Sequence, residues 1–170
     1  PSASAYYIYR SYAQPSLTVA RRICQNNGGD IAWANTAGEN SQMMSVAPSV
    51  RPDVVLFGGI KSGNQFSWVA TGGVFARLIV DRIWQCDMFC GWGSNQPDNA
   101  GGTETLVGFE QGSFTNIPWN DFTPGRGIGF ICRFPDALPR PPSPLPIDDP
   151  CTLAHCNGHA SSVSGFPSLG

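Results

Sequence analysis

The fold of this chain is restricted above all by its six cysteines. Their even number and spacings favour disulfide bonds, and with them an oxidising environment, over the reduced cytosol. Six cysteines allow 15 different pairings, and the spacings alone do not choose among them. We therefore expect a disulfide-stabilised domain that is secreted or displayed on the outer face of a cell.

The composition excludes several classes of function. Charged residues make up 13% of the chain and the net charge is −2, so there is no basic surface to contact phosphates, and nucleic acid is not an expected partner. No apolar run approaches the length of a membrane span. The 20 glycines and 15 prolines favour a loop-rich domain over a helical bundle.

Proline spacing divides the chain into a domain at 1–135 and a tail at 136–170. Six prolines fall within residues 136–150, which excludes a helix or a central strand and favours an extended spacer. The spacer would lead to a further domain, an anchor or a partner chain, and it permits an oligomer.

The tail carries two cysteines and the only two histidines of the chain. Cys151, His155, Cys156 and His159 could be read as a small zinc site, but the spacing is not a common zinc pattern and no core surrounds it. A local Cys151–Cys156 disulfide is the preferred interpretation, and pairing with another chain is the alternative.

Two helices are predicted in the first part of the chain, after a short strand at 6–9. Ser16 is a suitable N-cap for the first helix, which ends in a run of Asn and Gly. Thr36 can cap a second helix that extends to about Val46, and Glu39 stands where a capping box requires it.

The following segments favour strands and one long loop. Alternating or continuous apolar runs predict strands at 54–60, 65–69, 106–110 and 127–134. Residues 75–84 suit either a strand or a short helix. Residues 91–102 show no periodicity and predict a long irregular loop, which in a compact domain is usually functional.

This loop and the segment after it are rich in oxygen donors. The candidate side chains are Gln96, Asp98, Glu104, Asn120 and Asp121. Calcium takes six to eight oxygen ligands from such groups, whereas the absence of thiolates and imidazoles from the set disfavours zinc and copper. The alternative is a solvated polar loop with Asn and Asp in turns.

Taken in order, the motifs over about residues 6–134 resemble a C-type lectin domain. The matching features are a cysteine-bearing first helix followed by Gly-Gly-Asp-Ile-Ala, the second helix, Phe57-Gly-Gly-Ile60, Phe66-Ser-Trp68, Gln96-Pro-Asp98, Glu104, Trp119-Asn-Asp121 and Phe130-Ile-Cys132. The resemblance implies an α+β fold, with two helices on small antiparallel sheets and a long calcium-binding loop.

The resemblance also implies a ligand set and a ligand. The five oxygen-donor side chains would hold one calcium ion, with a cis peptide bond before Pro97, and two vicinal sugar hydroxyls would bind the ion. The Gln-Pro-Asp order is similar to galactose-type sites, which favours galactose or N-acetylgalactosamine. The aromatic residue that usually follows the tripeptide is missing from 99–103. Trp92, Trp84 or Phe89 could replace it, although core positions are the preferred interpretation of all three.

The cysteines follow the resemblance in part. Cys24 and Cys132 match the bridge between the first helix and the last strand, whereas the cysteines of the second bridge are missing. Cys86 and Cys90 instead lie within an apparent insertion at 74–91, and a local bridge between them is preferred over free thiols.

The sequence thus predicts calcium-dependent binding of glycans or glycoproteins, for adhesion or recognition outside the cell. Because both histidines lie in the tail, a catalytic triad is poorly supported and we do not expect an enzyme. The alternative is a lectin-like module that binds protein or builds an extracellular assembly, with a purely structural calcium.

Overall fold

The structure, a computed structural model, describes residues 4–10, 15–47, 54–110, 118–126 and 129–135. Its elements are β1 (Ser4–Arg10), α1 (Leu17–Asn26), β2 (Asp30–Ile31), α2 (Ala37–Val46), β3 (Val54–Ser62), β4 (Gln65–Trp68), β5 (Val74–Val80), β6 (Ile83–Cys86), the 3-10 turn η2 (Ala100–Gly102), β7 (Leu106–Glu110), β8 (Trp119–Phe122) and β9 (Gly129–Pro135). The predicted Cys151–Cys156 bridge and the tail lie outside the described residues.

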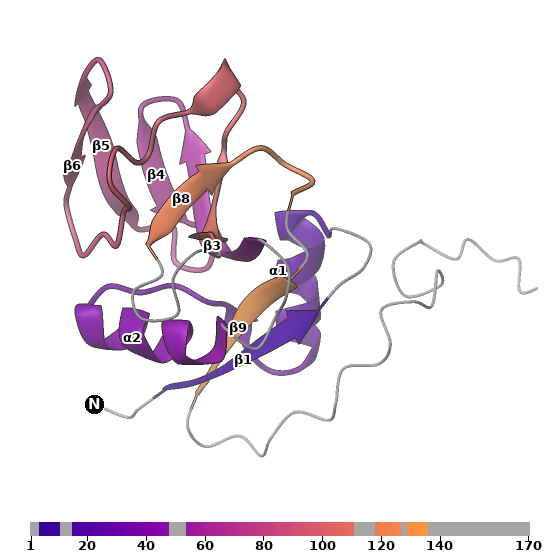
Figure 1. Ribbon diagram of the computed structural model, residues 1–170. Helices are drawn as coiled ribbons and strands as arrows, with labels where there is room; N and C mark the ends of the chain where they lie inside the picture. The colour runs from indigo at the N-terminus through magenta and orange to yellow at the C-terminus, as the bar shows by residue number, and fades with distance from the viewer. Residues whose placement is uncertain (1–3, 11–14, 48–53, 111–117, 127–128, 136–170) are drawn as a thin grey trace, which may run out of the picture.

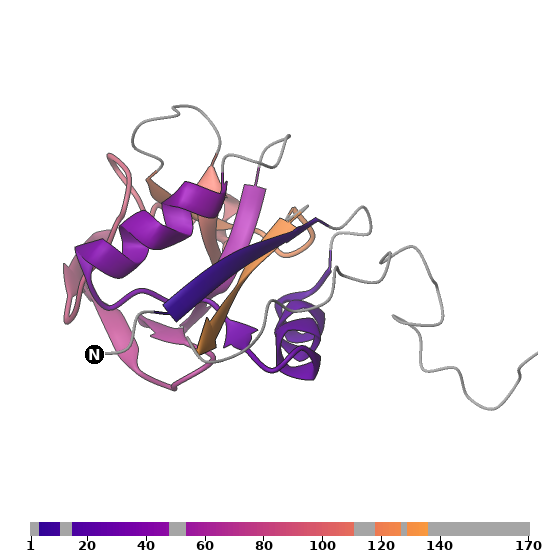
Figure 2. The same ribbon diagram turned by 90° about the horizontal axis from the view of Figure 1, so that it is seen from below.

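The strands of the described part form one connected sheet rather than separate small sheets. Its main path is β1-β9-β3-β4-β5-β6, with β2 added to β9, and β7 pairing with both β3 and β8. Strands β3 and β9 are parallel, and the remaining pairs are antiparallel. Both views show the β1–β9 pair running between the two helices, with the β5–β6 hairpin at the other end of the sheet (Figures 1 and 2). The predicted α+β architecture is confirmed.

Helix α1 begins and ends as its sequence predicts. The Ser16 hydroxyl accepts a hydrogen bond from the Val19 amide (3.3 Å), which satisfies one of the free N–H groups of the first turn. Leu17, Ala20 and Cys24 are buried on one face. The Cys24–Cys132 disulfide joins this face to β9, as predicted.

Helix α2 is capped from both directions. The Thr36 hydroxyl accepts from the Glu39 amide (3.2 Å), and the Glu39 carboxylate accepts from the Asn35 amide (2.8 Å). The reciprocal bond therefore reaches one residue before the N-cap instead of the N-cap itself. The other carboxylate oxygen of Glu39 binds Arg133 (2.7 Å) and ties the helix to β9.

An aromatic cluster fills the core beneath the candidate loop. Phe57, Phe66, Trp68, Phe75 and Trp119 are all fully buried, and their rings contact one another at centroid distances from 4.0 to 6.1 Å. Aromatic pairs of this kind add to the stabilisation from buried area. The candidate loop therefore lies over a densely packed aromatic core.

The segment 75–84, which suited either a strand or a helix, contains most of a β-hairpin. Strands β5 and β6 pair with each other, and Val80 faces Ile83 across the turn. The Cys86–Cys90 disulfide closes the end of this insertion, as predicted. Three apolar side chains at the tip stay largely exposed: Ile79 (59%), Val80 (57%) and Ile83 (60%).

Candidate metal centre

Strand β8 is placed by its first residue. The Trp119 ring is buried and its Nε1 donates to the Asn40 side chain of α2 (2.7 Å). Its backbone amide donates to the Gly91 carbonyl (2.7 Å), and its carbonyl accepts from the Gly93 amide (2.9 Å). A Cβ at Gly91 would lie 2.8 Å from Trp119 Nε1, so this approach requires glycine. These contacts fix the start of the loop against the strand that carries Asp121.

The loop itself turns sharply at the Gln-Pro-Asp tripeptide. The Gln96–Pro97 peptide bond is cis, and Asn95 and Asn99 on either side adopt left-handed conformations, which Asn tolerates better than most residues. The Gln96 Oε1 atom accepts a hydrogen bond from the Asp98 amide (3.1 Å). The expected cis bond before Pro97 is thus present in the structure.

Three carboxylates from separate segments converge at this turn. The candidate ligand oxygens of Asp98, Glu104 and Asp121 all lie within 4.8 Å of one another. Asp121 is fully buried and Glu104 nearly so, whereas Asp98 is accessible to solvent. Asp98 and Asp121 are 23 positions apart, with β7 between them and Asp121 on β8, so the fold brings them together.

Backbone amides hold two of the carboxylates in place. Asp121 accepts from the amides of Asp98 (3.1 Å) and Asn99 (3.0 Å), one on each oxygen. Glu104 accepts from the Ala100 amide (2.6 Å), and its own amide donates to the Asn99 side chain (3.2 Å). Each oxygen retains a further lone pair, so these bonds orient the carboxylates without blocking a ligand.

The electrostatics of the cluster favour neutralisation. Burial raises the pKa of Glu104 above its ordinary value, and the neighbouring Asp121 and Asp98 carboxylates raise it further against the Ala100 amide. Burial likewise raises the pKa of Asp121, although the amides of Asn99 and Asp98 lower it. The metal-free cluster therefore holds negative charge at a cost that a cation would remove.

The donor set fits calcium. Two oxygens that bind one Ca²⁺ ion at about 2.3 to 2.6 Å lie at most roughly 5 Å apart, and the three carboxylates meet this limit. All three are hard oxygen donors, which calcium prefers, and the described cluster includes no thiolate or imidazole. Gln96 lies against Asp98, and Asn120 directly precedes Asp121 on β8.

The structure places Trp92 in a different environment from the oxygen-donor candidates. Its ring contacts those of Phe66, Phe75 and Trp119 at 5.0 to 6.2 Å, and it pairs with Trp119 in an isolated β-bridge. These contacts place the ring in the aromatic cluster under the loop. Trp84 and Phe89 also pack against that cluster.

One residue that positions the site was not singled out from the sequence. Asn99 bonds both Asp121 through its amide and Glu104 through its side chain. Its place directly before the Gly-rich stretch 100–102 is the signal in the sequence that could have identified it, and the structure shows Asn99 in a left-handed conformation. Asn99 orients two carboxylates and is not itself among the clustered acids.

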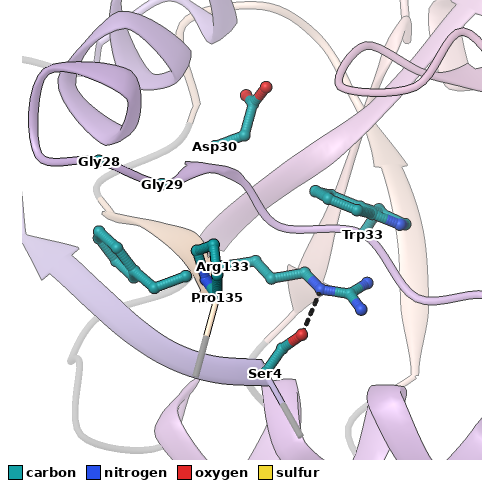
Figure 3. A pocket seen from close by; sticks show the side chains of 8 residues that line it. Ser4, Gly28, Gly29, Asp30, Trp33, Arg133 and Pro135 are labelled. Carbon is teal, nitrogen blue, oxygen red and sulfur yellow. Dashed lines mark hydrogen bonds between the residues drawn. The ribbon is translucent and has the colours of Figure 1, made fainter. Parts of the chain in front are cut away.

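A hollow of about 420 Å³ lies away from the carboxylate cluster, between β1, β9 and the turn after α1. Figure 3 shows the Arg133 side chain crossing it beside Trp33, with a hydrogen bond to Ser4 (2.9 Å). The guanidinium lies 4.3 Å from the Trp33 ring centroid and also binds Glu39. These contacts neutralise Arg133 and tie β9 to β1 and α2, which makes this hollow structural.

Comparison with known proteins identifies the architecture. No protein-family model matches the chain. The carbohydrate-recognition domain of the mouse scavenger receptor C-type lectin superposes with a TM-score of 0.56 at 20% identity, covering 82% of this chain and 96% of that one. The chain has a C-type lectin fold.

Two further structures with this C-type lectin fold are similar to the chain. The C-type lectin CEL-I from Cucumaria echinata has a TM-score of 0.59 at 15% identity, covering 78% of this chain and 91% of its own. The cow CD23 carbohydrate-recognition domain, solved in the presence of a GlcNAc2Man3 oligosaccharide, has a TM-score of 0.58 at 19% identity, with coverages of 79% and 90%. In the described part of the chain, no helix has the length and apolar character of a membrane span.

Proposed function

We propose that this chain binds one calcium ion through Asp98, Glu104 and Asp121, assisted by Gln96 and Asn120, and uses it to bind glycans outside the cell. The observation that carries this proposal is the convergence of three carboxylates, from Asp98, Glu104 and Asp121, within 4.8 Å of one another. The C-type lectin fold supports it, as do the two disulfides, which are typical of proteins in oxidising compartments.

Each residue of the site would have a distinct task. Bound calcium would supply two coordination positions for vicinal sugar hydroxyls. The Asp98 carboxylate, which is accessible, would accept a hydrogen bond from one hydroxyl, and the Gln96 amide would donate to the other; charge-assisted bonds of the first kind are the stronger ones. Glu104 and Asp121 are buried and oriented by backbone amides, so they would hold the ion and leave the sugar to the outer pair.

The order of amide and acid in Gln96-Pro97-Asp98 supports galactose or N-acetylgalactosamine as the preferred sugar. Monosaccharide binding should be weak, because a sugar buries little area and its hydroxyls must give up water. Several copies of the domain would then be needed for useful avidity. We accordingly propose recognition or adhesion, with no chemical turnover, as the role of the domain.

A glycan array tests this proposal. The purified chain should bind glycans with terminal galactose or N-acetylgalactosamine in calcium, and EDTA should abolish the signal. Signal on mannose-type glycans would keep the calcium mechanism and contradict the sugar preference. Signal that survives EDTA would contradict the calcium mechanism.

A second function is favoured by the exposed apolar tip of the β5–β6 hairpin. Ile79, Val80 and Ile83 are largely exposed on this hairpin, which would suit contact with a protein partner, and calcium would then only stabilise the loop. In this case the array would stay silent, and replacing these residues by Ser would abolish capture of the partner while leaving calcium binding intact.

A further inference from the structure

A hollow of about 380 Å³ lies directly beside the candidate metal centre. It is lined by Asn95, Gln96, Pro97 and Asp98 from the loop, and by Arg82 from the turn of the β5–β6 hairpin. The insertion at 74–91 therefore brings the positively charged side chain of Arg82 to the side chains that would face a bound sugar. The hairpin turn and the loop lie at the same end of the molecule, away from α1 and α2 (Figure 1).

The backbone conformation at Arg82 suits glycine better than arginine. Its φ is +65° in the tight turn between Val80 and Ile83. This left-handed conformation is unfavourable for an L-residue, whereas glycine adopts it without a steric penalty. A residue that the turn disfavours, at the edge of a hollow shared with candidate ligands, points to a role in binding.

Three arginines of the described residues have acidic partners, and Arg82 is not one of them. Arg21, Arg77 and Arg133 bind Asp30, Asp87 and Glu39, respectively. The structure shows no ion pair or hydrogen bond for the exposed Arg82 side chain in the same described part. Its guanidinium is thus available to an anion from solution.

The net charge of the calcium-loaded site explains what Arg82 would contribute to binding. Three carboxylates with one calcium ion carry a net charge of −1, which would repel an anionic sugar. The Arg82 guanidinium offsets this charge at the hollow, and its planar donors match a carboxylate or a sulfate. Because Asp81 does not line the hollow, the neighbouring acid is not the group that a sugar would meet.

We propose that Arg82 makes the site selective for acidic sugars, which carry a carboxylate or sulfate next to the hydroxyls held at the calcium. This inference rests on the proposed calcium-dependent sugar binding and specifies its ligand class. The anionic group occupies the hollow and contacts Arg82. The ring hydroxyls remain with Gln96 and Asp98.

Competition binding with the full chain in calcium tests the inference. The probes are galactose, galacturonic acid and 6-sulfated galactose, which all keep the vicinal 3- and 4-hydroxyls, and the last two separate a carboxylate from a sulfate preference. At low salt, at least one acidic sugar should bind roughly fivefold more tightly than galactose, the scale of one partly exposed charged pair. The preference should shrink as salt screens it.

Arg82→Gly is the decisive variant, because glycine suits the turn. It should abolish the acidic preference, retain galactose binding and keep or raise the urea concentration of half-unfolding. Arg22→Gln, which removes an exposed arginine from α1, should retain the preference and serves as the charge-matched control.

The outcomes separate this inference from the proposed function. Calcium-dependent galactose binding without an acidic preference, or a preference that survives in Arg82→Gly, would overturn the role of Arg82 alone. Failure of every sugar, neutral and acidic, to bind in calcium would overturn both proposals.

Discussion

Replacing Glu104 by Gln should change the stability of the chain in opposite directions without and with calcium. In the metal-free protein, the Glu104 carboxylate lies with those of Asp98 and Asp121, all within 4.8 Å. Two unit charges at that distance repel by about 1 kcal/mol in water and by about 3.5 kcal/mol at an effective dielectric constant of 20. Gln keeps the oxygen that accepts from the Ala100 amide, so removing the charge leaves this bond in place. We expect the free energy of unfolding in EDTA to rise by about 1 kcal/mol, the lower end of this range.

With calcium, the sign reverses. An ion that binds only the native state stabilises it by about 2.7 kcal/mol at a hundred times its dissociation constant. Glu104→Gln removes one of three charged ligands, so the variant should lose most of that gain. The same substitution therefore stabilises the empty site and destabilises the loaded one.

Urea unfolding of the full chain, followed by tryptophan fluorescence in EDTA and in calcium, measures both effects. Glu39→Gln is the matched control, because Glu39 binds Arg133 and the Asn35 amide far from the cluster. That control should lower stability equally in both conditions. If Glu104→Gln also lowers stability equally in both, the carboxylate cluster is not a calcium site.

Three further predictions use the same protein. Asn120→Ala should abolish calcium-dependent sugar binding while circular dichroism shows an intact fold; unchanged binding on the array would remove Asn120 from the site. The folded-state pKa values of Glu104 and Asp121 lie above their unfolded values, so the native state binds more protons than the unfolded state. The free energy of unfolding of the metal-free wild type, measured relative to that of Glu104→Gln, should therefore fall as pH rises above about 4. Urea unfolding in EDTA at several pH values checks this, and a rise would contradict it. Replacing Cys24 and Cys132 by Ser opens a loop of 108 residues and should lower the free energy of unfolding by about 4.7 kcal/mol; a loss below about 1 kcal/mol would refute the assigned weight of this bridge.

The helices could be predicted from the sequence because their signals are local. Ser16 and Thr36 cap the helices that they were expected to cap. The hairpin at 74–86 could not, because its turn is Asp81-Arg82, without the glycine or asparagine that usually marks a left-handed turn position. A short, largely apolar run without a turn signal reads equally well as one strand or one helix.

The sequence pointed to the residues of the carboxylate cluster but not to its geometry. Motif order pointed to Asp98, Glu104 and Asp121, yet their orientation depends on amides of Asn99 and Ala100 that the folded loop presents. The parallel pairing of β3 with β9 is likewise a contact between distant segments, which no local pattern specifies. The place of Arg82 beside the loop follows from the same long-range packing.

A crystal structure of the chain grown in calcium, with the metal located by its anomalous scattering, tests the central claim most directly. The expected result is one ion that contacts carboxylate oxygens of Asp98, Glu104 and Asp121 at about 2.3 to 2.6 Å. After a galactose soak, two vicinal hydroxyls should lie on the same ion. No ion at this cluster in millimolar calcium, or an ion bound elsewhere in the domain, would contradict the account.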